Sequence, residues 1–112
     1  MNTAAEVLEQ AASRIEQAWQ QVGGVFEWGG TCASNAICDA TVHMGPLLAA
    51  QEAMLRALGA PPEGSLAPIW HWNDAPGRTK AEVVAMLRAV AATERARAAR
   101  LLPVTVPERV PA

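Results

Sequence analysis

The stretch WNDAPGRTKAEV, residues 72–83, marks the point where the chain turns and enters its last helix. Asn and Asp, which stand near its start, hydrogen-bond nearby backbone groups and favour turns. Pro76 and Gly77 suit the two central positions of a type II turn, because glycine adopts the positive φ that the second position needs. Arg78 follows closely enough to pair with Asp74 across the turn. The stretch therefore predicts a tight, charge-paired turn.

A Thr followed three residues later by a Glu occurs at residues 3–6 and again at 79–82. This is the pattern of a capping box, in which each side chain accepts a hydrogen bond from the other residue's backbone N–H at a helix start. Apolar residues recur at spacings of three and four after both boxes, as on one face of a helix. We therefore predict long helices over 3–22, ended by Gly23-Gly24, and over 79–100.

Shorter helices are expected over residues 34–42 and 65–72, and a central one over 46–58, where proline suits the first helical position. The two long helices should pack on the central helix and bury a common apolar core. The predicted core residues are Leu8, Ile15, Trp19, Ile37, Leu48, Leu55, Val83, Leu87 and Val90.

Two short β-prone runs, residues 25–28 and 31–32, flank Gly29-Gly30. Such a pattern predicts a tight β-hairpin. An isolated hairpin is marginal in water, so this one should pack on the helices through Phe26 and Trp28.

The composition is that of a folded protein, with 51% hydrophobic and 18% charged residues in a chain of 112. This length predicts one domain. We expect a mainly α domain of four to five helices with one short β-hairpin over residues 1–102. Residues 103–112 form a Pro-rich C-terminal tail, which is either disordered or adds an edge strand through residues 104–106.

The charges exclude some classes of partner. The net charge is −2, whereas proteins that bind nucleic acid usually present a basic face, so no nucleic-acid partner is expected. No run of about 18 apolar residues predicts a membrane span, and the acidic, polar N-terminus does not resemble a secretion signal. Residues 1–56 carry −4 and residues 57–112 carry +2, which weakly favours antiparallel helix packing or self-association.

Cys32 and Cys38 do not form a disulfide framework, so a cytoplasmic, reduced protein is the simplest interpretation. A zinc site built from these thiols with His43 and His71 is disfavoured, because the cysteines stand six apart whereas structural zinc usually uses closer pairs. No metal and no cofactor are therefore expected. Cys32 follows Gly-Gly-Thr and can begin a helix, a position that activates thiols, although nothing places a histidine beside it as a base.

The turn of residues 72–83 also has a functional interpretation. A helix N-terminus beside an arginine can hold a phosphate or carboxylate, and an exposed tryptophan can stack on a base. The same residues are explained as turn formers and helix caps without a ligand, which is the favoured interpretation, and the ligand site stays open as the alternative. The candidate ligand-binding residues are Trp72, Asn73, Asp74, Arg78, Thr79 and Cys32.

The pattern W-N-D-x-x-G-R-T-x-x-E-V, residues 72–83, resembles the hallmark of an uncharacterised family of small bacterial and phage proteins, a domain of unknown function. Members are similar in beginning with an amphipathic helix, followed by a Trp-Gly stretch and a cysteine that opens an alanine-rich helix. Residues 28–33 fit that description. The resemblance implies a fold and no particular activity.

Two functional hypotheses follow. The first is a small non-enzymatic protein-interaction or regulatory module with a protein partner or a second copy of itself, favoured by the small size, the four tryptophans and the weak catalytic inventory. The alternative is a domain that binds a small anion or nucleotide-like molecule, or a thiol-dependent enzyme, using the loop of residues 73–79.

Overall fold

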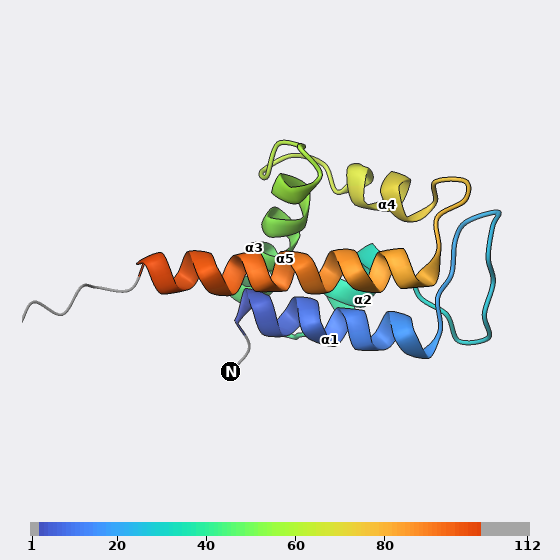
Figure 1. The fold of residues 1–112 in the computed structure, drawn as a ribbon, viewed down its shortest axis with the longest axis horizontal. Coiled ribbons are helices and arrows are strands. Elements are labelled where there is room, and N and C mark those ends of the chain that lie inside the picture. The colour runs from blue at the N-terminus through green and yellow to red at the C-terminus, as the bar shows by residue number, and fades with distance from the viewer. Residues whose placement is uncertain (1–2, 102–112) are drawn as a thin grey trace, which may run out of the picture.

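The computed structural model describes residues 3–101, which fold into five helices (Figure 1). No strand occurs within that range. The mainly α fold is thus confirmed, and the predicted β-hairpin is not found. The helices are α1 (Ala4–Gln17), α2 (Ala33–Asp39), α3 (Met44–Ala57), α4 (Ala67–Asn73) and α5 (Lys80–Leu101).

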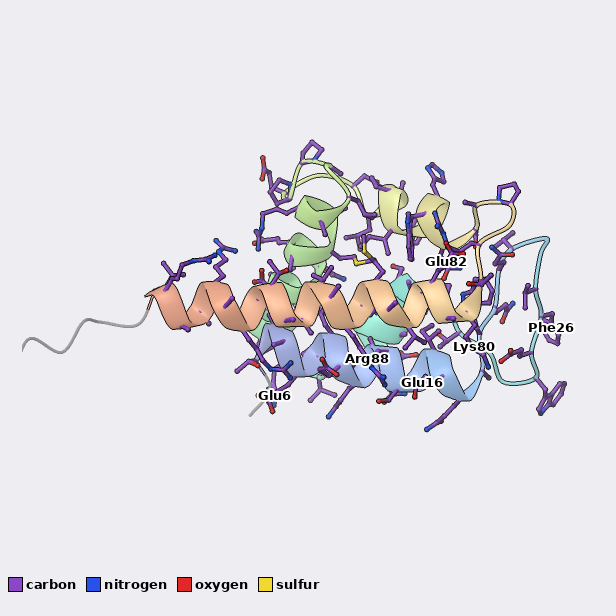
Figure 2. The ribbon with its side chains drawn as sticks, viewed as in Figure 1. Glu6, Glu16, Phe26, Lys80, Glu82 and Arg88 are labelled. Atoms are coloured by element: carbon purple, nitrogen blue, oxygen red, sulfur yellow. The ribbon has the colours of Figure 1, made fainter. Side chains whose placement is uncertain are left out.

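The helices α1 and α5 lie side by side and antiparallel, and α3 crosses the pair (Figure 1). Glutamates on α1 face arginines on α5: Arg88 Nη2 lies 2.8 Å from Glu16, and Arg95 Nη1 lies 3.2 Å from Glu9. Figure 2 shows Glu16 and Arg88 side by side along this seam. Exposed pairs of this kind contribute at most about 1 kcal/mol each, so the seam sets the pairing of the helices more than their stability.

Both capping boxes form as predicted. Thr3 Oγ1 accepts from the Glu6 backbone N–H at 3.2 Å, and a Glu6 carboxylate oxygen accepts from the Thr3 N–H at 3.0 Å. The same exchange joins Thr79 and Glu82 at the start of α5. The hydrogen bond from the Thr3 backbone, and then that from its hydroxyl, lowers the pKa of the exposed Glu6 carboxyl. Local sequence is therefore enough to fix where both long helices begin.

The core contains many alanines, which let the helices approach closely, packed between larger apolar side chains. Leu48 is the one predicted core residue that is wrong, because it is 48% exposed on the outer side of α3. That helix instead buries Ala50, Ala53 and Met54. The predicted core residues that are buried are Leu8, Ile15, Trp19, Ile37, Leu55, Val83, Leu87 and Val90.

The first helix is shorter than predicted, because it ends at Gln17 rather than at residue 22. Ala18 is extended, with φ −162° and ψ 127°. The N–H of Trp19 donates to a Glu27 carboxylate oxygen at 2.8 Å, and its indole N–H donates to Asn73 at 2.8 Å. Bonds to distant residues therefore replace the helical bonds that local sequence favours.

The segment predicted as a hairpin forms a different structure. Only two isolated bridges occur within residues 3–101, a parallel one between Trp19 and Thr31 and an antiparallel one between Gln20 and Phe26. Both involve residues expected to be helical, so the extended residues after α1 replace the predicted partner strand. Phe26 and Trp28, expected to pack on the helices, are 67% and 93% exposed.

The remaining boundaries shift by a few residues. The helix predicted over 34–42 is α2 and ends at Asp39, and α4 runs one residue past its predicted end, to Asn73. The start of α3 at Met44 makes Pro46 the third helical residue, where its missing N–H still falls in the unbonded first turn. Residues 103–112, including the edge strand considered for 104–106, lie outside the described residues.

Candidate functional site

Asn73, the last residue of α4, is completely buried and all of its side-chain hydrogen-bonding positions are filled. Its Oδ1 accepts from the indole N–H of Trp19 at 2.8 Å and from the backbone N–H of Ala33 at 3.1 Å. Its Nδ2 donates to the Gln20 carbonyl at 3.0 Å and to Asp74 Oδ1 at 3.0 Å. One amide thus joins the end of α4, the extended residues after α1 and the start of α2.

Two neighbouring side chains extend this network. Gln21 Nε2 donates to the carbonyls of Asn73 and Ala75 at 2.8 and 3.1 Å. Asp74 Oδ1 also accepts from the Val22 N–H at 3.2 Å. We call Trp19, Gln21, Asn73 and Asp74 the Asn73 latch. The latch fixes residues 19–22 against the turn that leads into α5.

Arg78 lies on the other side of this turn. Its guanidinium carbon is 4.1 Å from the ring centre of Trp72, and its Nε donates to the Trp72 carbonyl at 2.9 Å. Its ion-pair partner is Glu82, at 3.4 Å, so the predicted pairing of Arg78 with Asp74 is wrong. Asp74 instead accepts backbone and amide hydrogen bonds inside the latch.

The turn itself forms as predicted. Gly77 has φ +80°, and the Arg78 N–H donates to the Ala75 carbonyl at 3.0 Å, as in a type II turn. Thr79 then caps α5. The hydrogen bond from the Thr79 backbone, followed by that from its hydroxyl, lowers the pKa of the exposed Glu82 carboxyl, and Arg78 adds a smaller effect in the same direction. All five candidate ligand-binding residues between positions 72 and 79 thus have partners within the protein.

Cys32, the sixth predicted site residue, lies next to the latch in space, because the backbone N–H of the following residue, Ala33, donates to Asn73 Oδ1. Its sulfur caps α2 by accepting from the Asn35 N–H at 3.5 Å. A small pocket of about 110 Å³ opens beside it, lined by Gln20, Val22, Gly30, Thr31, Cys32 and Asn35. Cys38 is exposed, and both thiols are free.

No three His, Cys, Asp or Glu side chains gather closely enough to hold a metal ion within residues 3–101. Among the helices of the same residues, none combines the length and the hydrophobicity of a transmembrane span.

The sequence did not predict that the loop of residues 22–30 forms an exposed surface. We call it the aromatic loop, because it exposes Val22, Phe26 and Trp28 at 83%, 67% and 93%. Figure 2 shows Phe26 at its outer end, beyond the last turn of α1. The only sequence signal was the density of large apolar residues between glycines, which equally suits a buried hairpin.

The aromatic loop is held in place at its base. One Glu27 carboxylate oxygen accepts from the Trp19 N–H at 2.8 Å and from Lys80 Nζ at 3.2 Å. The Trp19 bond, and then the Lys80 bond, lowers the pKa of Glu27. A Cβ on Gly30 would lie 2.8 Å from the Trp19 carbonyl oxygen, so only glycine fits this close approach. The loop is therefore anchored to the extended residue Trp19 after α1 and to Lys80 at the start of α5, while Val22, Phe26 and Trp28 are exposed.

The profile of a Family of unknown function (DUF6197) matches residues 1–93. The chain belongs to this family. The DUF6197 match takes in the Asn73 latch, the aromatic loop and the turn into α5, and it ends before the last turns of α5. No curated protein and no solved structure matches the chain.

Proposed function

We propose that this DUF6197 chain is a small non-enzymatic protein-interaction or regulatory module, and that the aromatic loop is its docking surface. The observation that supports this most directly is the 93% exposure of Trp28 on a loop whose base is fixed by Glu27, Lys80 and Gly30. Large apolar side chains exposed on the protein surface mark interaction sites. Tryptophan is also enriched among the residues that contribute most to binding energy at protein interfaces.

The anchoring of the loop matters for affinity. A surface that is already ordered loses little conformational entropy on binding. Val22, Phe26 and Trp28 are exposed apolar side chains of one loop, and such side chains fit an apolar pocket on a protein partner. The free thiols of Cys32 and Cys38 accord with a cytoplasmic setting, which is part of the proposal together with a bacterial or phage origin.

The alternative is a site for a small anion or a nucleotide-like molecule, or thiol chemistry, at Trp72, Asn73, Asp74, Arg78, Thr79 and Cys32. The contacts give it less support. Asn73 has no free hydrogen-bonding position, and Arg78 is engaged by Trp72 and Glu82. The pocket beside Cys32 is about 110 Å³, whereas ligand sites usually span roughly 300–1,000 Å³.

The proposal is tested by placing the photoreactive residue benzoylphenylalanine at position 28 and irradiating a native extract of the source organism. We expect one protein to be crosslinked from position 28 and not from position 70, where a half-exposed tryptophan of α4 provides the matched control. Replacing Phe26 and Trp28 by serine should abolish co-purification of that protein without changing the helical circular dichroism. Equal crosslinking from both positions, or none from position 28, would contradict the proposal.

A further inference from the structure

The start of α3 presents apolar side chains to solvent. Val42, Met44 and Leu48 are 95%, 64% and 48% exposed. Met44 and Leu48 stand four residues apart, so their side chains are neighbours on one face of the helix. Glu52, which is also exposed, stands four residues further along the same face. We call Met44, Leu48 and Glu52 the α3 stripe, which is apolar at its first two positions and acidic at its third.

The end of α2 lies beside this stripe and adds a second carboxylate. Cys38 Sγ accepts from Gln51 Nε2 at 3.6 Å, and Gln51 is the residue before Glu52. Asp39, which follows Cys38 and ends α2, is exposed. The surface of α2 and α3 around the stripe therefore carries two exposed carboxylates.

No positive side chain of the described structure balances these two carboxylates. The sequence contains no lysine or arginine over residues 15–55. Arg56, one turn beyond Glu52, pairs with Glu94 at 3.4 Å. Asp39 and Glu52 make no ion pair within residues 3–101. The α3 stripe therefore suits an occupant that combines an exposed apolar side chain with positive charges.

The end of α5 has that combination. Figure 1 shows its last turns projecting past the first residues of α1, and Leu101 is 73% exposed there. Arg97 stands three residues before Arg100 and four before Leu101, so it neighbours both on the helix surface. Arg97 comes no closer than 3.8 Å to Glu94, and Arg100 makes no ion pair within residues 3–101. We call Arg97, Arg100 and Leu101 the α5 end.

We propose that the α5 end of one chain docks on the α3 stripe of a second copy, with Leu101 over the apolar part of the stripe and the two arginines beside its carboxylates. The occupant is a second copy because the chain itself carries both complementary surfaces, in accord with the −4 of residues 1–56 and the +2 of residues 57–112. Unlike surfaces that meet join copies head to tail, in a ring or an open chain. This self-association goes beyond the proposed function, since the aromatic loop belongs to neither surface.

Sedimentation velocity of the full chain tests the proposal first. Between about 0.01 and 1 mM we expect the mean mass to rise above that of one chain, with a dissociation constant on the order of 0.1 mM. Raising the ionic strength from about 0.05 M to about 0.5 M should reverse the rise, because salt screens exposed charges. A single-chain mass at every concentration would overturn the proposal.

Charge reversal identifies the two surfaces. Glu52→Arg and Arg100→Glu should each weaken the association by roughly tenfold, because each sets like charges against one another. An equimolar mixture of the two variants should again form dimers. The α5 end of the Glu52→Arg chain and the α3 stripe of the Arg100→Glu chain are both unaltered, so these two surfaces can still meet. A mixture that stays monomeric would contradict the head-to-tail contact.

Glu63→Arg and Arg14→Glu are the matched controls, because both side chains belong to exposed residues outside the two surfaces. Each should associate as the parent chain does, and an effect equal to that of Glu52→Arg or Arg100→Glu would overturn the assignment. The double variant Phe26→Ser, Trp28→Ser should also associate normally. Loss of association in that variant would instead assign the contact between copies to the aromatic loop, so the failure of either proposal can be recognised separately.

Discussion

The turn of residues 72–83 and the aromatic loop differ in what their distinctive residues do. In the turn, Asn73 is buried, Arg78 stacks on Trp72, and Thr79 and Glu82 cap α5. In the loop, Phe26 and Trp28 contribute little to the core and face solvent. The stretch that looks most like a motif is thus occupied by structural contacts, whereas the stretch that looks like core is available to partners. A distinctive stretch of sequence can be required for folding or for binding, and the contacts of its side chains show which of the two applies.

The substitution Asn73→Ala tests most directly whether the turn of residues 72–83 has a structural role. The change leaves the Trp19 indole N–H, the Ala33 N–H and the Gln20 carbonyl without their buried partner. At about 1–3 kcal/mol for each unsatisfied group, with some relaxation, we expect a loss of roughly 3–5 kcal/mol in the free energy of unfolding. Urea denaturation followed by tryptophan fluorescence measures it.

Asn35→Ala provides the control for that experiment, because the Asn35 side chain is exposed on α2 and only its backbone N–H caps the helix. It should change the stability by no more than about 0.5 kcal/mol. A loss below about 1 kcal/mol for Asn73→Ala would show that the latch does not hold the fold together, and would return Asn73 to the list of ligand candidates.

The latch also shows what could not be predicted from sequence. The capping boxes at Thr3 and Thr79 and the turn at Gly77 were predictable, because each depends on residues within a few positions of one another. The early end of α1 and the missing hairpin depend on bonds from Asn73 to residues about 40–54 positions away. Local propensity does not contain that information.

The same reasoning applies to the candidate site. Asn73, expected in the turn, is the last residue of α4. Asp74, Arg78 and Thr79 were correctly placed on a turn at a helix start, since the turn and cap signals are local. Their partners were not, because Arg78 was assigned to Asp74 whereas Glu82 and the Trp72 ring compete successfully for it. The exposure of Leu48 and Trp28 was missed for a related reason: an apolar residue in a pattern does not show whether another element covers it.

Arg78→Ala should have the next largest effect. It removes the stacking on Trp72, the hydrogen bond to the Trp72 carbonyl and the ion pair with Glu82. We expect a loss of about 1–2 kcal/mol in unfolding free energy, measured by urea denaturation. Arg78→Lys should recover little of this loss, because an ammonium group cannot reproduce the planar stacking and the Nε donor.

The outcome for Arg78 also separates its structural role from a ligand role. Unchanged stability in Arg78→Ala, together with loss of inorganic phosphate binding that the parent chain shows by calorimetry, would favour the anion site at residues 73–79. Reduced stability with no phosphate binding in either protein would favour the structural role.

Thr79→Ala should cost about 1 kcal/mol, the usual effect of removing a helix N-cap. It should also change how stability depends on pH. Glu82 has a lowered pKa in the folded protein, so its contribution is present above the unfolded pKa and is lost as the pH falls through the folded one. The variant keeps the backbone bond from residue 79, which lowers the Glu82 pKa most, and removes the hydroxyl bond, which is the second cause, so it should lose somewhat less stability on acidification than the parent chain. Thermal unfolding at pH values between about 3 and 6 measures this. Parallel pH curves for the two proteins would contradict the assignment.

The smallest effect on stability is expected where the effect on binding is largest. Trp28→Ser removes a side chain that is 93% exposed, so the free energy of unfolding should change by less than about 0.5 kcal/mol. Trp19→Phe is the matched contrast, because that tryptophan is buried and its indole N–H donates to Asn73; its loss should cost well over about 1 kcal/mol. Urea denaturation curves of the two variants and the parent chain give the two changes in unfolding free energy. A large loss for Trp28→Ser would mean that the side chain is covered in solution, and the aromatic loop would then be part of the fold's own packing rather than a surface kept open for a partner.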